Sequence, residues 1–386
     1  MKEIVINQWT GLEDIIGWDY METDEVRVTV KRDASFKLMA EGTFVAAVQA
    51  IKMRSRKLSI HFLLDLKNAI ASPSDDSLWP DFLNSLGGLA LIQIADKITD
   101  SSNRDITSDL VTAIWENRVI PARGMIGDGK KRSIVCRFPG NPVPRCLRQS
   151  SEVKVPQRLQ FEELLRKLGK DLGATGMKST DSFLDSLTED ELSGFLFESF
   201  RNVMEHNVDV PLGVWGVTVE KVVITEREDI RSRGQIPPLV YDYLDREIAT
   251  RSGKKRGFLL SVTIADYGPG IQHTLPILPD ADESGWERMK RAFEKGVSRK
   301  PKSGSPDWGQ GLPNILDTVK QLKAILFVRS AEEAAIIDGG LDNREWIRVS
   351  ERGAASAIVA GTSLSAIWIV RDDNPDQSTF DFVTHV

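Results

Sequence analysis

The sequence predicts an α/β protein: a C-terminal two-layer α/β sandwich with a mixed sheet and helices on one face, preceded by a smaller α/β domain. The chain has 386 residues, more than one compact core usually holds. Apolar strand-type runs alternate with helical stretches along it. Residues 139–158 contain four prolines among polar residues, a composition typical of linkers. We therefore expect two domains, 1–150 and 151–386.

The first domain shows a strand–helix–strand order. Val26–Val30 alternates as a strand does, Gly42–Arg54 has helical spacing of small and apolar residues, and Leu58–Leu66 is typical of a buried strand. We expect a further helix at Asp109–Asn117 and a further strand at Arg132–Phe138. The pattern resembles that of STAS-type regulatory domains, which implies a regulatory or interaction role.

The second domain opens with two helical stretches. Pro156–Leu172 is charged and amphipathic. Thr188 and Glu191 form a capping box, so a second helix is expected to begin there and to run toward Asn207.

That second helix carries polar residues at a regular interval. Glu198, Asn202 and His206 follow one another at steps of four, on a different face from the apolar stripe. Any solvated helix shows polar residues with this spacing, so the face identifies no site by itself.

A glycine-rich turn follows the strand expected at Phe258–Ala265. Asp266, Gly268 and Gly270 form a D-x-G-x-G motif directly after it. The glycines allow a flat ligand to approach the backbone, and the carboxylate accepts a hydrogen bond from an exocyclic amine. The alternative is a simple turn after a strand.

Two further motifs come later in the chain. Gly309, Gly311 and Leu312 form G-x-G-L at the start of a helix expected at Pro313–Leu322. Backbone N–H groups at a helix N-terminus suit a phosphate chain, although the alternative is a flexible loop before a helix. The pair Gly361-Thr362 leads the last strand, Ser363–Val370, and such pairs often do no more than begin a strand.

Taken in order, these four motifs resemble the N, G1, G2 and G3 boxes of the GHKL superfamily of ATPases. This superfamily includes DNA gyrase B subunits, heat-shock chaperones, histidine kinases and MutL proteins. The resemblance covers residues 185–372 and implies that the chain binds ATP with Mg²⁺. Gyrase-like and MutL-like enzymes carry a transducer domain after the ATPase domain. The end of this chain at Val386 is nearer to histidine kinases and anti-sigma serine kinases.

The resemblance assigns roles on the predicted helix. It implies that Glu198 is the general base for the attacking water and that the side-chain oxygen of Asn202 holds Mg²⁺. It places His206 against the nucleotide. Glu205 stands where histidine kinases often have lysine, and no phosphoacceptor-histidine signature precedes the domain.

The resemblance also assigns the remaining motifs. It implies that Asp266 accepts from the adenine amino group, supported by Thr362, and that Gly268 and Gly270 shape the base pocket. The phosphates would lie at the G-x-G-L motif formed by Gly309, Gly311 and Leu312.

One stretch departs from the family pattern. Asp266 follows Asn202 by 64 positions, where a short hairpin is usual, and the excess lies in Thr225–Arg256. This stretch is either a partner-binding insertion or an elaborated surface loop. A protein partner is expected here or on the first domain, and dimerisation is open.

Composition narrows the location and the partners. Acidic residues outnumber basic ones by 56 to 50, so the formal charge of −6 argues against nucleic acid and anionic membranes. No signal peptide or membrane-spanning run is seen, and Cys136 and Cys146 are too few for a disulfide framework. These features predict a cytoplasmic protein.

The sequence argues against a zinc site and a P-loop. The histidines are scattered without the paired spacing of zinc ligands. Gly124–Lys131 nearly spells a P-loop, but Lys131 stands where Ser or Thr would ligate Mg²⁺ and a β-like run follows. We interpret this stretch as a turn.

Two function classes follow. The chain is either an ATPase or protein kinase acting on the γ-phosphate, or a nucleotide-gated switch or adaptor with little turnover. A lid over roughly Gln272–Trp308 is expected to become ordered when the γ-phosphate is present, with Phe293 and the basic residues of 295–302 folding onto the triphosphate.

Overall fold

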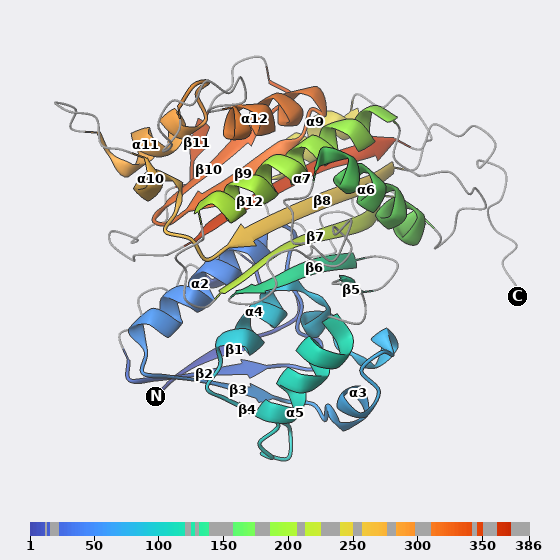
Figure 1. The fold of residues 1–386 in the computed structure, drawn as a ribbon, viewed down its shortest axis with the longest axis vertical. Helices are drawn as coiled ribbons and strands as arrows, with labels where there is room; N and C mark the ends of the chain where they lie inside the picture. The colour runs from blue at the N-terminus through green and yellow to red at the C-terminus, as the bar shows by residue number, and fades with distance from the viewer. Residues whose placement is uncertain are drawn as a thin grey trace, which may run out of the picture.

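The strands of the protein form two sheets, with helices between the sheets and over the larger one (Figure 1). The computed structural model describes residues 1–11, 14–15, 23–119, 125–127, 131–138, 157–173, 186–206, 213–224, 240–249, 257–275, 283–297, 310–341, 346–349 and 361–371. One sheet is parallel and the other antiparallel, so the expected α/β class is confirmed in general terms.

The smaller sheet contains the first four strands in chain order, all parallel. They are β1 (Lys2–Ile6), β2 (Glu25–Val30), β3 (Lys57–Phe62) and β4 (Lys97–Thr99). Helix α2 (Ala40–Arg54) connects β2 to β3, and α4 (Leu86–Ile94) lies between β3 and β4. Parallel neighbours need such crossover connections. The first two strands and the first helix expected from the sequence are therefore confirmed.

The larger sheet has eight strands in the order β11-β10-β9-β12-β8-β7-β6-β5, and all its neighbours are antiparallel. They are β5 (Met125–Gly127), β6 (Lys131–Phe138), β7 (Gly213–Ile224), β8 (Gly257–Asp266), β9 (Ile325–Ser330), β10 (Glu333–Asp338), β11 (Trp346–Arg348) and β12 (Thr362–Arg371). The expectation of a mixed sheet is wrong. Tight connections are one physical reason: a chain that turns within two residues, as between β9 and β10, returns antiparallel.

Two strands of the larger sheet precede the proline-rich stretch. β6 pairs with β7 from Lys131↔Glu220 to Phe138↔Gly213, and β5 pairs with β6. Arg132–Phe138, expected in the small domain, therefore belongs to the larger sheet, because that sheet satisfies its backbone hydrogen bonds. Within the stretch Gly124–Lys131, Met125–Gly127 forms β5, which pairs antiparallel with β6. Residues 124 and 128–130, where the turn is expected, lie outside the described residues.

Helices cover both faces of the larger sheet, whereas the sequence predicts them on one face only. α6 (Arg158–Gly173), α7 (Ser186–His206) and α12 (Gly311–Gln321) pack on one face. α2 and α4 pack on the other face, over β8, β12 and β7, and thus lie between the two sheets (Figure 1). Almost all residues of both helices are buried.

A buried carboxylate ties α2 to the larger sheet. Glu41 is 4% exposed, and its Oε1 accepts hydrogen bonds from Thr218 Oγ1 and the Gly87 backbone N–H, each at 3.1 Å. Its Oε2 lies 2.9 Å from Nζ of Lys131 on β6. Because a buried charge is costly unless it is paired and hydrogen-bonded, this network favours one placement of α2 on the sheet.

The remaining helices are short. They are α3 (Lys67–Ala71), α5 (Thr107–Thr112), α9 (Tyr241–Ala249), α10 (Ile271–Thr274) and α11 (Gly285–Ala292). The helix expected at Asp109–Asn117 is present as α5 continued by a π-helical segment, Ala113–Val119. No helix in the described part of the chain is long and apolar enough to cross a membrane.

Helix α9 lies within the stretch Thr225–Arg256. Its Tyr243 and Leu244 are 2% exposed and join the core between the sheets. Its Arg246 donates to Asp338 Oδ1 on β10 at 2.8 Å. The described portion of this stretch is therefore packed against the body of the protein.

Candidate functional site

The ends of β8 and β12 place two predicted site residues opposite each other. Along β8, Val262 and Ile264 pack in the core under α7 and α12, whereas Ala265 and Tyr267 pack in the core shared with α2. Side chains alternate along a strand, so Asp266 lies on the α7 and α12 face. Thr362 is its register partner on β12 and lies on the same face.

Helices α7 and α12 run antiparallel above this face. Thr318 Oγ1 donates to Glu191 Oε2 at 3.0 Å, and one turn earlier on α12 Asn314 Nδ2 donates to Glu198 Oε1 at 3.2 Å. The start of α12 therefore lies beside the C-terminal half of α7.

The strand after α12 shows which end of the sheet this is. β9 begins opposite Ile367, at Ile325, and ends opposite Thr362, at Ser330. Since α12 leads into the start of β9 and runs back over the sheet, its N-terminus points to the end that carries Thr362 and Asp266. The described residues of the four predicted motifs therefore lie toward the same end of the larger sheet.

Gly311, the first residue of α12, lies close to α7. A Cβ added there would lie 3.2 Å from both Asn202 Oδ1 and Glu198 Oε2. The absence of a side chain therefore lets the start of α12 approach both oxygens closely.

Two polar side chains of α7, those of Glu198 and Asn202, face Gly311. Glu198 is 9% exposed, and its Oε2 lies 2.6 Å from a guanidinium nitrogen of Arg201. The Arg201 guanidinium also lies over the Phe197 ring, 5.5 Å from its centre. Asn202 Nδ2 is buried and has no hydrogen-bond partner among the described residues. An unsatisfied amide of this kind indicates a place for a ligand or water.

The D-x-G-x-G turn is held by backbone contacts. Asp266 Oδ1 accepts from the Gly268 N–H at 2.6 Å, and the Gly268 carbonyl accepts from the Gly361 N–H at 2.5 Å. Gly270 and Gly361 have φ angles of 93° and 95°, which favour glycine. Burial raises the pKa of the Tyr267 hydroxyl, so the group remains protonated.

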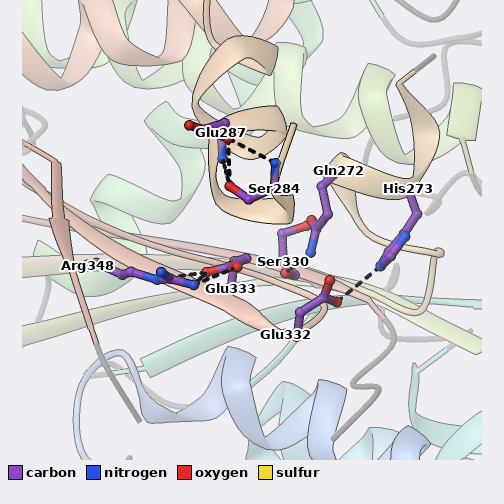
Figure 2. A network of polar contacts seen from close by, with 8 residues as sticks. All are labelled: Gln272, His273, Ser284, Glu287, Ser330, Glu332, Glu333 and Arg348. Atoms are coloured by element: carbon purple, nitrogen blue, oxygen red, sulfur yellow. Dashed lines mark hydrogen bonds and ion pairs between the residues drawn. The ribbon is translucent and has the colours of Figure 1, made fainter. Parts of the chain in front are cut away.

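Figure 2 shows how α10, which follows this turn, is fastened to the β9–β10 hairpin. Ser330 Oγ accepts from the Ile271 N–H, and the Ser330 carbonyl accepts from Gln272 Nε2, both at 2.6 Å. His273 Nε2 lies 3.1 Å from Glu332 Oε2. The next residue on β10, Glu333, has a pKa raised by burial, an effect that the nearby Arg348 guanidinium opposes.

The described part of the predicted lid is packed against the protein. α11 begins with a capping box formed by Ser284 and Glu287 (Figure 2). Phe293 is 5% exposed and packs edge-on against Trp346, with the ring centres 5.1 Å apart. Lys295 Nζ lies 3.4 Å from Asp317 Oδ2. The Phe293 ring lies in the core of this structure, and its movement onto a bound triphosphate stays a prediction. Residues 276–282 and 298–309 lie outside the described part.

The structure therefore brings together most of the predicted site residues. Glu198, Asn202, Gly311 and Leu312 lie at the α7–α12 junction, and Asp266, Gly268, Gly270 and Thr362 lie at the strand ends. Gly309 lies outside the described residues. His206 is the last residue of α7, and its side chain is not described.

Three contacts of the site were missed from the sequence. Arg201 and Asn314 both bind Glu198, and Ser330 anchors α10. The spacing of three between Glu198 and Arg201 on one helix was a readable signal. Asn314 and Ser330 contact residues far away in the chain, so local spacing could not predict their contacts.

The oxygens of Asn202 and Glu198 suit a hard cation such as Mg²⁺, which prefers oxygen ligands and takes few from the protein when phosphates are bound. The close approach of Gly311 brings the N-terminus of α12, which favours negative charge, next to these oxygens. In the described part of the chain, no three His, Cys, Asp or Glu residues form a metal cluster of their own. Comparisons with protein families, curated proteins and solved structures give no match for this chain.

Proposed function

We propose that this chain binds ATP with Mg²⁺ at the sheet end where β8, β12, α7 and α12 meet. The observation that carries the proposal is the close approach of Gly311, at the N-terminus of α12, to Asn202 and Glu198. The same sheet end carries Asp266 opposite Thr362. The motifs at these positions resemble the boxes of GHKL ATPases, which supports a nucleotide rather than another anionic ligand.

In this proposal the base and the phosphates contact different elements. Asp266 accepts a hydrogen bond from the adenine amine, and Gly268 and Gly270 keep the base pocket free of side chains. The phosphates lie at the N-terminus of α12, where unpaired N–H groups and the helix dipole favour negative charge.

The proposed reaction is slow hydrolysis or phosphoryl transfer in a signalling or assembly role. Asn202 would hold Mg²⁺ through its side-chain oxygen, and the bound ion would neutralise phosphate charge. In hydrolysis, the water oxygen bonds to the γ-phosphorus and the bond to the β–γ bridging oxygen breaks. Glu198 takes the proton of the water.

A second function, a nucleotide-gated switch with little turnover, is favoured by the Arg201–Glu198 ion pair at 2.6 Å. A guanidinium stabilises the charged form of a carboxylate, so the pair must loosen before Glu198 accepts a proton. In either function the bound nucleotide controls binding of a protein partner or of a second copy of the chain. A protein partner would bind the four-stranded unit or the stretch Thr225–Arg256.

Calorimetry with Mg-ATP tests the site. Asp266→Asn and Asn202→Ala each remove one polar partner, and we expect each to weaken binding by about 1–3 kcal/mol. Asp242→Asn on α9 and Asn68→Ala on α3 are matched controls at exposed positions and should bind like the wild type. Wild-type affinity in both site variants would show that the site is wrongly assigned.

A further inference from the structure

We propose that Gln49 of α2 is a positioning residue for the base-binding turn, and that the four-stranded unit thereby sets the affinity of the nucleotide site. The inference rests on the proposed function, because it concerns the same site. It adds a regulatory element from a part of the chain that the four motifs do not include.

Helix α2 lies directly against the ends of β8 and β12. Gln49 Nε2 donates to the Tyr267 carbonyl at 3.0 Å. One turn earlier, Ala46 Cβ lies 3.7 Å from the position that a Cβ on Gly361 would take. Another turn earlier, Gly42 lies so close to Ser363 that an added Cβ would overlap its side chain. One face of α2 therefore follows the base-binding end of the sheet.

The contact of Gln49 acts on a single peptide group. The Tyr267 carbonyl and the Gly268 N–H belong to one planar trans peptide, whose C=O and N–H point in opposite directions. Gln49 holds the carbonyl end, and Asp266 Oδ1 accepts from the N–H end at 2.6 Å. The two side chains therefore fix the same peptide plane from opposite sides.

This arrangement connects Gln49 to the carboxylate that would read adenine. If the Tyr267 carbonyl loses its donor, the peptide can rotate, and the Gly268 N–H no longer holds Asp266 Oδ1 in one orientation. Glycine at 268 offers little resistance to such rotation. A positioned carboxylate binds an amine better than a mobile one, because less conformational freedom is lost on binding.

The opposite side of α2 packs in the four-stranded unit. Phe44 is fully buried and packs against Phe36 and Phe82, with ring centres 4.7 and 6.2 Å away. A ligand or partner that shifts the four-stranded unit would therefore move α2, and with it Gln49. This supplies a physical route from the first unit to the nucleotide site.

Nucleotide titrations of four full-length proteins test the inference: the wild type, Gln49→Ala, Gln49→Glu and Gln93→Ala. Gln49→Glu keeps the size of the side chain but removes the N–H donor. Gln93 lies on α4, which packs on the same sheet face, and serves as the matched control. Loss of one hydrogen bond should raise the Kd for ATP about 3- to 10-fold in both Gln49 variants and leave Gln93→Ala unchanged.

A second ligand separates positioning from general loosening of the fold. Purine riboside triphosphate lacks the exocyclic amine, so its Kd should change little in the Gln49 variants. Their preference for ATP over this analogue should narrow accordingly. Equal weakening of both ligands, or wild-type Kd values for ATP, would overturn the inference. Failure of the wild type itself to bind ATP would instead reject the proposed function.

Discussion

At the residue scale, the proposed hydrolysis depends on Glu198. It is nearly buried, receives a hydrogen bond from Asn314 at 3.2 Å and lies 2.6 Å from Arg201. Asn314 and Arg201 hold the Glu198 carboxylate beside Gly311. The Arg201 guanidinium also stabilises the negative charge of this carboxylate. The contact with Arg201 therefore positions Glu198 but also reduces its tendency to accept a proton.

The rate of phosphate release by two variants shows which of these two effects is larger. Glu198→Ala should retain ATP binding and lower release by about 10²–10⁴-fold, the usual contribution of a general base. Arg201→Ala should raise release several-fold, because the carboxylate is then less strongly held in its charged form. Arg166→Ala, which removes an ion pair with Glu162 on α6, is the control and should leave release unchanged.

Two results would contradict this account. Slower release by Arg201→Ala would mean that the guanidinium assists the reaction, for example by contacting phosphate. Undetectable release by the wild type, alone and with partners, would favour the nucleotide-gated switch.

At the scale of elements, the proposed phosphate site depends on how α7 and α12 pack together. The first residue of α12 is a glycine, and its missing side chain lets α12 approach Asn202 and Glu198 closely. Alanine is the better helix former by about 1 kcal/mol. Close packing of the two helices therefore explains the glycine better than helix stability does.

Gly311→Ala should separate stability from binding. A Cβ only 3.2 Å from two polar oxygens crowds the space, so we expect about tenfold weaker ATP binding, in line with overpacking costs of about 1–3 kcal/mol. The free energy of unfolding should fall by no more than about 2 kcal/mol, because the helix propensity of alanine, about 1 kcal/mol, offsets part of the overpacking cost. Calorimetry and urea titration measure the two quantities.

Gly194→Ala on α7 is the control for this substitution. Its added Cβ would meet Arg158 at 3.5 Å, an ordinary contact, so binding should be unchanged. Unaltered ATP affinity in Gly311→Ala would place the phosphates away from the start of α12.

At the scale of the whole molecule, the two sheets share one core. Apolar residues of the four-stranded unit cluster with residues on the second face of the larger sheet, among them Leu259, Phe327 and Ile367. α2 and α4 contribute to both sides. The two sheets are therefore expected to unfold together, although the proline-rich stretch suggests independent domains.

Phe44→Ala tests this cooperativity by hydrogen exchange. Removing a buried phenylalanine costs about 3–5 kcal/mol, and we expect protection to fall in β8 and β12 as much as in β2 and β3. Phe200→Ala, in the core under α7, should likewise lower protection in all four strands. Loss confined to β2 and β3 in Phe44→Ala would show that the four-stranded unit is a separate folding domain.

The sequence by itself was sufficient for the local features. Apolar periodicity predicted α2, α7, β3, β8 and β12 within a few residues, because each element depends on its own spacing. The four motifs were readable for the same reason: Glu198 and Asn202 are one helical turn apart, and Asp266 directly ends a strand.

Only the tertiary structure decided how these pieces combine. The pairing of β6 with β7, the burial of α2 between two sheets and the contact of Gln49 with Tyr267 join residues far apart in the chain. Such contacts depend on which apolar faces cover one another, and local spacing carries no information about that choice. For this reason the sequence by itself determined the residues of the candidate site, whereas the fold decided what surrounds and positions them.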